Sequence, residues 1–471
     1  MNSSLQSLIN SQIQKGGQRV AFRLGHEKIT WSELDQASTR RLQDYRKAGV
    51  KPGDRILCKL PTSLELPIAV LTHLRGGFIH VPVAPTSSQT AVTHLIELTS
   101  PRCIIEEGIR TFHEISPSPA LAVPDPAWIL STSGTTGMPK GVLHTHRSLL
   151  AGIGALTELW EWCPADHQIL ALPLFHVHGL GIGILGAMLR GVETTLLPRF
   201  DTAQLCQAMA RHKATLFMGV PTMYYQLLKL FEEDPVWSEH FHKARLCTAG
   251  SAALGAERLQ RFEALTGQRI LERYGMSETL ITVSNPYRGD RRSGSMGVPL
   301  ANVQTRIVDG ELQVRGRALM AGYWNQPQVT QAAYSEDDWF RTGDQVEEDA
   351  DGYLYHRGRR SIDWIKSGGW RIGTHELEEA LLRDSRVEEV AVVGLPDEEW
   401  GEIVAAAIVC KGDAQQLLIE LAHGIRQQFP RHQHIRRWLV VQQLPRNAMG
   451  KIQKAQLKHH AEGWQRLKVP S

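Results

Sequence analysis

Short apolar runs alternate with longer helix-like segments between about residues 20 and 250, and this alternation restricts the fold more than any other feature of the chain. Four such runs are Arg55 to Leu60, Ala127 to Leu130, Gln168 to Leu172 and Ala214 to Met218. Runs of this length read as strands, and the segments between them are long enough for helices. The pattern predicts an α/β fold of layered subdomains with parallel strands.

The residue pattern changes after about residue 300, from alternating strands and helices to strands and turns. Asp-Gly at 309–310 and at 351–352 is typical of hairpin turns, so a β-rich piece is expected to close the large unit. The sequence after Gly358 predicts a small α+β domain. Its expected elements are a helix (HELEEALLRD), two strands (VEEVAVVGLP and IVAAAIVCKG), a long helix and a last strand (IRRWLVVQQLP). The predicted domains are residues 1–358 and 359–471, with the boundary near 358–362.

The amino-acid composition limits the kinds of protein that this chain can be. The chain has 471 residues, 42% of them apolar, which favours two or more folded domains. A net charge of +3 on 21% charged residues gives no reason to expect a nucleic acid or a membrane surface as partner. The six cysteines show no metal-ligand or disulfide spacing, and the N-terminus has no secretory signal, so a cytoplasmic protein is expected. The sequence carries no signal for an oligomeric state.

The segment Ser131 to Gly141, STSGTTGMPKG, combines hydroxyls, glycines and Lys140. Such a loop supplies N–H and O–H donors to a phosphate without a carboxylate to repel it. It departs from the common P-loop, in which the lysine precedes Ser or Thr, because Lys140 precedes Gly141. Together with its flanks it reads as a strand, a loop and then a helix, a context that suits an anion.

This loop resembles the phosphate loop of the acyl-adenylate-forming superfamily, which includes acyl-CoA synthetases, luciferases and the adenylation domains of peptide synthetases. Later segments resemble other motifs of that superfamily in the same order: ERYGMSET (272–279), WFRTGD (339–344), GYLYHRGRRSIDWIKSGGWRI (352–372) and PRNAMGKIQK (445–454). The resemblance covers essentially the whole chain. Several ordered motifs make it far more specific than any one of them.

The resemblance implies a role for each matching residue. Glu278 would hold magnesium, Ser277 would lie beside the α-phosphate, and Asp344 with Arg359 would bind the ribose hydroxyls. The remaining residues expected at ATP or AMP are Thr132, Ser133, Gly134, Thr135, Thr136 and Lys140 in the loop, Gly250, Ser251, Ala252 and Tyr274 around the adenine, and Gly275 next to Tyr274. ATP, magnesium and coenzyme A are therefore the expected co-substrates and cofactor.

The small domain would contribute in two ways. A carboxylate that attacks the α-phosphate approaches a polyanion, so the reaction needs cations, and the resemblance assigns this role to Lys451. In a second orientation of the domain, a thiol channel would be lined by Lys366, Gly368, Gly369 and Trp370. Many relatives carry Asp or Lys at the hinge where this chain has Ser361, which leaves the hinge position uncharged.

Four stretches (170–191, 214–227, 249–254 and ERYGMSETL) resemble malonyl-CoA synthetases more than aryl or long-chain fatty acid ligases. A dicarboxylate brings a second negative charge into the acyl pocket, where an unpaired charge is costly, so an arginine is expected there. Arg273 is one candidate and Arg292 a second, although a structural cation is as good a reading of Arg292. His176 resembles a gating histidine beside the reactive carboxylate, and His178 is either a pocket residue or a core histidine.

Gly181 to Gly186 spells the dinucleotide fingerprint G-x-G-x-x-G, but the glycines lie inside an apolar helix-like run and not at a strand-to-helix turn. We interpret them as sites of close helix packing.

The sequence therefore predicts an ATP-dependent carboxylate–CoA ligase that acts through an acyl-adenylate, with malonate or methylmalonate as substrate. Three alternatives remain at this point. The acid could be a short monocarboxylate, the acceptor could be the thiol of a carrier protein, or the chain could be a non-catalytic nucleotide-binding module.

Overall fold

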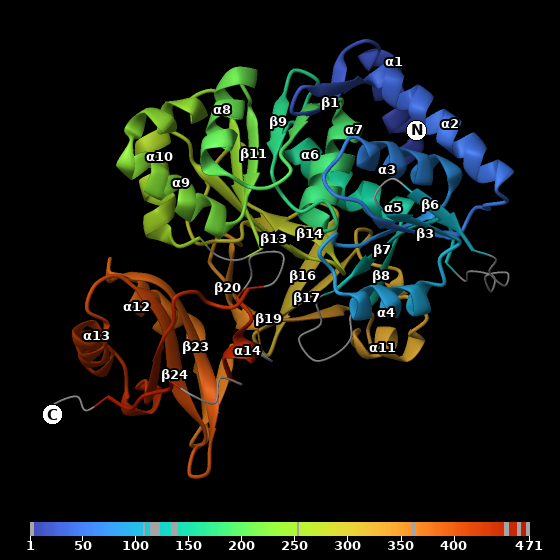
Figure 1. Ribbon diagram of the computed structural model, residues 1–471. Coiled ribbons are helices and arrows are strands. Elements are labelled where there is room, and N and C mark those ends of the chain that lie inside the picture. Colours follow the sequence, from blue (N-terminus) through green and yellow to red (C-terminus); the bar gives the residue numbers. More distant parts are fainter. Residues whose placement is uncertain are drawn as a thin grey trace. The chain divides into compact units, whose positions relative to one another are not determined.

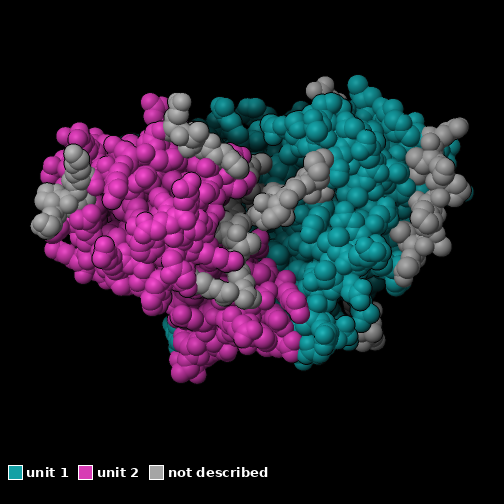
Figure 2. Space-filling model, turned by 90° about the horizontal axis from the view of Figure 1, so that it is seen from below, with its two compact units in different colours: residues 1–305, 314–340 teal, residues 306–313, 341–471 magenta. Residues whose placement is uncertain are grey.

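The computed structural model describes residues 4–106, 109–113, 123–132, 140–251, 254–359, 363–446, 452–458 and 463–467. Packing divides the chain into two compact units, which Figure 2 colours separately. Unit 1 comprises residues 1–305 and 314–340, and unit 2 comprises residues 306–313 and 341–471. Residues 341–358 thus pack with unit 2, while the predicted division into residues 1–358 and 359–471 stays a prediction.

A nine-stranded sheet forms one layer of unit 1, in the order β15-β14-β13-β12-β11-β9-β10-β1-β2. Its strands are parallel from β13 to β1 and antiparallel at both edges, so the α/β fold with parallel strands is confirmed. The bounds are β1 Val20–Leu24, β2 Glu27–Thr30, β9 His167–Leu170, β10 Glu193–Leu196, β11 Leu216–Gly219, β12 Leu246–Ala249, β13 Ile270–Met276, β14 Leu280–Ser284 and β15 Val298–Pro299.

Helices cover both faces of this sheet. On one face, α8 (Thr202–His212), α9 (Pro221–Glu233) and α10 (Ala256–Thr266) pack over β11 and β12, with Phe217, Tyr224, Phe231 and Phe262 in a continuous buried core (Figure 1). The other face carries an apolar helical run that contains the G-x-G-x-x-G sequence. That run begins as the π-helix η2 (Val177–Leu185) and continues as α7 (Gly186–Arg190).

Glycines in this run allow close packing against the sheet and against a neighbouring helix. A Cβ atom on Gly183 of η2 would lie 2.6 Å from Leu170 Cδ2 of β9, and one on Gly186 of α7 would lie 3.0 Å from Thr157 Cγ2 of α6 (Ala155–Leu159). Both distances are too short for a side chain to fit without movement. The interpretation of this motif as helix packing is confirmed. The other helices of unit 1 are α1 Leu5–Gly16, α2 Trp31–Lys47, α3 Glu65–Gly76, α4 Gln89–Thr99, α5 His146–Leu149, η1 Leu150–Gly154, η3 Pro235–Phe241 and α11 Pro327–Ala332.

A second sheet of unit 1 has seven strands in the order β18-β8-β7-β4-β3-β5-β6. The bounds are β3 Arg55–Lys59, β4 Ile79–Pro82, β5 Cys103–Glu106, β6 Ile109–Phe112, β7 Pro126–Ser131, β8 Gly141–Thr145 and β18 Gly322–Tyr323. The expected helix directly after the glycine-rich loop is wrong, because β8 comes first. Val142 and Leu143 are buried and pair with β7, and only at Thr145, whose side chain caps α5, does the helix begin.

The β-rich piece is a sheet of four strands in the order β16-β17-β19-β20, with bounds β16 Val303–Val308, β17 Glu311–Gly316, β19 Phe340–Glu348 and β20 Leu354–Arg359. Both Asp-Gly hairpin signals are confirmed. Asp309 and Gly310 have φ angles of 51° and 75°, and Gly352 has a φ angle of 82° in the turn that joins β19 to β20. Positive φ angles are the reason that Asp or Asn and Gly are favoured there.

The C-terminal α+β domain in unit 2 contains the elements that the sequence predicts, in the predicted order. Its sheet joins β22, β21, β24 and β23, and β25 pairs with β24. The bounds are β21 Trp364–Ser367, β22 Trp370–Gly373, α12 Thr374–Leu382, β23 Val387–Asp397, β24 Gly401–Cys410, α13 Ala414–Gln428, η4 Arg431–Gln433, β25 Arg437–Val440 and α14 Lys454–Lys458. Across the described residues, every helix is too short or too polar to span a bilayer.

Candidate active site

The predicted phosphate loop connects β7 to β8, two neighbouring antiparallel strands. Thr132 N donates to Lys140 O at 3.0 Å and so closes the base of the loop. Lys140 Nζ lies 4.8 Å from the centre of the Tyr323 ring, within the range of a cation–π contact. Ser133, Gly134, Thr135 and Thr136 lie outside the described residues.

Glu278 lies in the turn between β13 and β14, where its side chain is buried. The Tyr323 hydroxyl donates to Glu278 Oε1 at 3.0 Å, and Met320 N donates to Glu278 O at 2.7 Å. Gly275, at the end of β13, allows the turn to close, since a Cβ atom there would lie 1.8 Å from Leu280 O. The chain thus holds a buried carboxylate in a tight turn, on the same unit as Lys140.

His144 on β8 supports the neighbouring Ser277, and sequence reasoning missed it. Its Nε2 donates to Ser277 O at 2.6 Å, while Nδ1 lies 3.0 Å from Ser148 Oγ. Burial lowers the pKa of His144 to about 4, despite the opposing hydrogen bond to Ser277, so the imidazole is neutral at pH 7. No alternation along β8 indicates the position of His144, because Val142, Leu143 and His144 are all buried.

Arg273 on β13 is a buried cation whose guanidinium is incompletely paired. Its side chain packs against Gly250, where a Cβ atom would lie 2.4 Å from Arg273 Cζ. Among the described residues, Nε and Nη2 of Arg273 find no hydrogen-bond partner, and burial lowers the pKa of the group to about 10. Gly250 and Ser251, which are predicted to flank the adenine, follow β12, and Ser251 has a φ angle of 74°. Ala252 lies outside the described residues.

His178 on η2 joins Arg273 in the same region of unit 1. It is buried, and both of its ring nitrogens also find no hydrogen-bond partner in the described part of the chain. Burial, and then the positive charge of Arg273, hold the pKa of His178 well below its usual range. A buried guanidinium and a buried neutral imidazole, each with nitrogen atoms that lack a hydrogen-bond partner among the described residues, form a site that an anion would complete.

Two other residues predicted for the substrate have different surroundings. Burial lowers the pKa of His176 to about 4, and its ring centre lies 4.5 Å from that of Phe175. Arg292 lies on the loop after β14, where its backbone N–H donates to Asn285 Oδ1 at 3.0 Å and its Nε pairs with Asp290 Oδ2 at 3.0 Å. The assignment of both to the substrate stays a prediction.

Glu272 is a second residue that sequence reasoning missed. Its Oε2 accepts a hydrogen bond from Gly294 N at 2.8 Å, and it holds the loop that carries Arg292 beside β13. Burial raises its pKa to about 7, although the backbone N–H groups of Gly294 and Leu254 lower it. A glutamate directly before Arg273 was the available signal, but it carries no chemistry on its own.

Unit 2 holds the residues predicted to bind ribose. Asp344 on β19 pairs across the sheet with Arg359 on β20, with Arg359 Nε donating to Asp344 Oδ1 at 2.8 Å. Burial raises the pKa of Asp344, but His356, at 3.7 Å, and Arg359 outweigh it, and the pKa falls well below its usual range. Asp344 is therefore an ionised acceptor, held in place by the Arg359 guanidinium and contacted by the His356 ring.

The predicted thiol channel residues form the β21–β22 hairpin. Gly368 and Gly369 have φ angles of 55° and 84° at its turn, and the Trp370 ring stacks on His432 with 4.3 Å between centres. Lys366 N donates to Glu402 Oε2 at 2.8 Å, and its side chain is exposed. Whether these residues line a channel stays a prediction. Ser361 and Lys451 lie outside the described residues.

Lys454, by contrast, lies within the described residues, and its side chain is only 10% exposed. Its Nζ contacts Asp363 Oδ1 at 2.6 Å, Glu378 Oε1 at 2.8 Å and Thr374 Oγ1 at 2.8 Å. Asp363 Oδ2 also accepts a hydrogen bond from Arg359 N at 2.8 Å. The segment that follows Lys451 in sequence is therefore fixed to the segment that follows the hinge.

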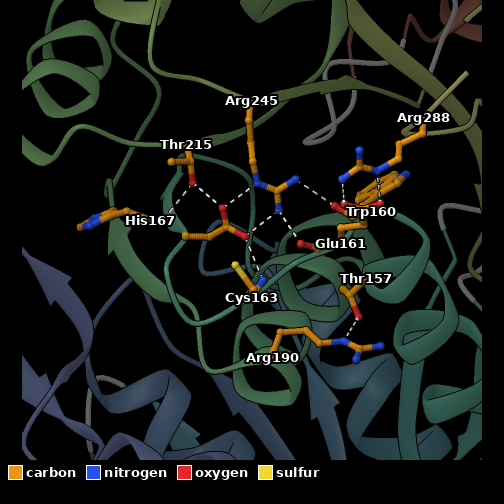
Figure 3. A network of polar contacts seen from close by, with 10 residues as sticks. Thr157, Trp160, Glu161, Cys163, His167, Arg190, Thr215, Arg245 and Arg288 are labelled. Atoms are coloured by element: carbon orange, nitrogen blue, oxygen red, sulfur yellow. Dashed lines mark hydrogen bonds and ion pairs between the residues drawn. The ribbon is translucent and has the colours of Figure 1, made fainter.

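A network at the amino ends of β9, β11 and β12 fixes the sheet below the site (Figure 3). Asp166 accepts hydrogen bonds from Arg245 Nε at 2.7 Å and Nη2 at 2.6 Å, from Thr215 Oγ1 at 2.7 Å and from Cys163 N at 2.9 Å. Arg245 Nη1 donates to Trp160 O at 3.0 Å. The network lies at the amino ends of these strands, whereas Gly250 and Ser251 follow the carboxyl end of β12. The predicted ligand site is therefore at the carboxyl ends of the strands, as expected for an open α/β sheet.

The comparison with known families settles the family. The profile of the AMP-binding enzyme family matches residues 9–123 and 106–324, and that of the AMP-binding enzyme C-terminal domain matches residues 376–451. This chain belongs to the AMP-binding enzyme family. It resembles the acyl-CoA synthetases of that family, and the predicted superfamily is confirmed.

Individual AMP-binding enzymes are also similar to it. A probable CoA ligase of Humulus lupulus is 36% identical over 84% of this chain and 70% of its own length. The malonate–CoA ligase of Arabidopsis thaliana is 38% identical over 72% of this chain, which spans only 61% of that relative.

Two solved structures share the fold. ATP-bound MatB from Rhodopseudomonas palustris has a TM-score of 0.87 and 29% identity, and the match covers 97% of this chain and 98% of that one. A ternary product complex of malonyl-CoA ligase with methylmalonyl-CoA and AMP has a TM-score of 0.67 and 35% identity over 91% and 97% of the two chains.

Proposed function

We propose that this AMP-binding enzyme is an ATP-dependent carboxylate–CoA ligase that acts on malonate or methylmalonate. In the first step a carboxylate oxygen bonds to the α-phosphorus of ATP and the bond to pyrophosphate breaks. In the second, the thiol sulfur of coenzyme A, having lost its proton, bonds to the acyl carbon, and AMP leaves. The similarity to malonate–CoA ligases and to malonyl-CoA ligase structures supports this reaction.

The observation that carries the choice of acid is the buried pair of Arg273 and His178. A monocarboxylate with a neutral acyl group would leave the Arg273 cation without an anion in a region that excludes water. The second carboxylate of malonate would remove that penalty, because a charge-assisted hydrogen bond to a guanidinium is among the strongest polar contacts. The neutral imidazole of His178 can donate a further hydrogen bond to the same oxygen atoms.

We assign the remaining roles from the sequence motifs and the surroundings of each residue. Lys140 and the loop before it bind phosphate, Tyr274 lies at the adenine, and Asp344, ionised and oriented by Arg359, accepts the ribose hydroxyls. The low pKa of His176 keeps its imidazole neutral, so it can orient the reactive carboxylate as a neutral hydrogen-bond donor. Lys451 supplies the cation for the developing charge on the carboxylate and the α-phosphate.

Glu278 fits a magnesium ion that is bound mainly by phosphates. It is a buried carboxylate with one oxygen already set by a tyrosine hydroxyl. Within the described residues, no cluster of three or more His, Cys, Asp or Glu could hold a metal. Magnesium commonly takes one or two carboxylates, several waters and the phosphates of its nucleotide, and it neutralises phosphate charge when bound.

CoA-dependent formation of AMP, measured with malonate, methylmalonate, acetate and butyrate, tests the proposal. Malonate or methylmalonate should give the highest kcat/KM. Faster turnover of acetate or butyrate would mean that the substrate is a short monocarboxylate. Acid-dependent pyrophosphate exchange without transfer to CoA would mean that the acceptor is another thiol, such as that of a carrier protein. If no acid supported exchange, the protein would be a non-catalytic nucleotide-binding module.

The location of the enzyme is a further part of the proposal. All six cysteines are unpaired, and Cys163 is exposed to solvent. Unpaired cysteines suit a reducing compartment, and we propose the cytoplasm.

A further inference from the structure

One short segment of unit 1 connects the two elements that are predicted to bind phosphate and metal. Met320 N donates to Glu278 O at 2.7 Å, Ala321 N donates to Leu143 O at 2.8 Å, and Trp324 N donates to Gly141 O at 2.7 Å. The segment 320–324 therefore fixes the Glu278 turn to the strand that follows Lys140.

Tyr323 is the side chain of this segment that contacts both functional groups. Its hydroxyl donates to Glu278 Oε1 at 3.0 Å, and its ring lies beneath Lys140 Nζ, 4.8 Å from the ring centre. Its own backbone is fixed, because Tyr323 N donates to Thr330 Oγ1 at 2.8 Å and the residue pairs with Val142 in the β18–β8 ladder. A rigid aromatic side chain thus contacts a carboxylate and an ammonium at two separate places.

We propose that Tyr323 is a positioning residue for the nucleotide–metal complex, which sets the Glu278 carboxylate through its hydroxyl and Lys140 through its ring. The inference rests on the proposed function only in taking Glu278 as the magnesium ligand and Lys140 as a phosphate ligand. The hydroxyl fixes the orientation of the Glu278 carboxylate as a whole, and so the direction from which that carboxylate meets a metal. With the ammonium held over the ring, Lys140 loses fewer conformations when phosphate binds.

Two substitutions separate the two contacts. Tyr323→Phe keeps the ring beneath Lys140 and removes only the hydroxyl from Glu278. Tyr323→Leu removes both. Tyr355→Phe is the matched control, because Tyr355 in unit 2 also donates its hydroxyl to a carboxylate, Asp349 Oδ2, at 3.1 Å. Circular dichroism melts establish that each variant is folded.

The readouts are the magnesium half-saturation of acid-dependent pyrophosphate exchange, the affinity for Mn²⁺ in the presence of ATP by electron paramagnetic resonance, and the affinity for ATP in EDTA by calorimetry. Tyr323→Phe should raise the magnesium half-saturation and weaken Mn²⁺ binding by about 10- to 100-fold, the usual effect of losing a partner of a metal ligand. Its affinity for ATP in EDTA should equal that of the wild type. Tyr323→Leu should in addition bind ATP more weakly in EDTA.

A Tyr323→Phe variant with wild-type magnesium half-saturation and wild-type Mn²⁺ affinity would overturn the role of the hydroxyl. Unchanged affinity of Tyr323→Leu for ATP in EDTA would overturn the role of the ring. Failure of the proposed function gives a different result, in which the wild type shows no acid-dependent exchange. The Mn²⁺ and ATP titrations still decide the inference in that case.

Discussion

Substituting Arg273 by methionine should make the folded protein more stable while it removes the preference for a dicarboxylate. Arg273 is only 7% exposed, and its Nε and Nη2 have no partner among the described residues. Methionine has a similar length and no charge, so it fills the same space against Gly250 without requiring an anion. The expected gain arises because the native residue is suited to a ligand and not to the unliganded fold.

The size of the gain follows from the pKa. Burial lowers the pKa of Arg273 from 12.5 to about 10. One pKa unit corresponds to about 1.4 kcal/mol, so the fold disfavours the cation by about 3 kcal/mol at pH 7. Some packing of the guanidinium on Gly250 is lost in the variant, and we therefore expect the free energy of unfolding to rise by about 2 kcal/mol.

Calorimetric unfolding of the unliganded protein measures this change, and Arg55→Met is the matched control. Arg55 is equally buried, but it donates to Thr99 O and Ser100 O, both at 2.7 Å, so the control should be destabilised. A loss of stability in Arg273→Met that equals the loss in Arg55→Met would refute the reasoning. It would mean that Arg273 stabilises the fold and is not reserved for an anion.

Three further predictions concern the fold and the division of roles. Asp166→Ala should lower the free energy of unfolding by about 3 to 5 kcal/mol, because it leaves the partly buried Arg245 without its carboxylate partner. The kcat of the folded variant should stay unchanged, and a large loss of kcat would show that the network acts on the site. Burial holds the pKa of His73 well below its usual range and lowers that of His80 to about 3, with their Nδ1 atoms 2.8 Å apart. Both are neutral in the fold and take up protons on unfolding, so stability should be full above about pH 6.5 and fall as the pH decreases toward 3, by about 1.4 kcal/mol per pH unit for each histidine. Denaturant unfolding between pH 7.5 and 4.5 measures this slope, and a flat profile would contradict it. Lys451→Ala should abolish pyrophosphate exchange and leave thioester formation from supplied acyl-adenylate largely intact; equal loss of both would refute its assignment to adenylation alone.

Local patterns in the sequence were sufficient for much of the fold. Apolar runs between helix-like segments predicted the parallel strands, and Asp309-Gly310 predicted its hairpin because few residues accept positive φ angles. The C-terminal elements were also predicted in order. The strand β8 was missed, since the sequence before Thr145 is short and its pairing with β7 across the loop is not a local property.

Sequence motifs supplied the candidates Glu278, Asp344 and Arg273, and their roles stay predictions. The sequence also named His178 for the substrate, but it could not show that His178 lies close enough to Arg273 for the charge of Arg273 to lower its pKa, because the two residues are far apart in sequence and only the fold brings them together. Tyr323 and His144 were missed for the same reason. Each acts by contacting a motif residue from another strand, and neither residue type indicates such a contact by itself.

The most direct test of the central claim compares two substrates of nearly equal size that differ in one charge. The ratio of kcat/KM for malonate to that for its monomethyl ester should be roughly 100 or more in the wild type, because the second carboxylate pairs with the buried Arg273 cation, worth about 3 kcal/mol. In Arg273→Met the ratio should fall to about one. A ratio near one in the wild type would contradict the assignment of Arg273 to the second carboxylate and, with it, the choice of a dicarboxylate substrate.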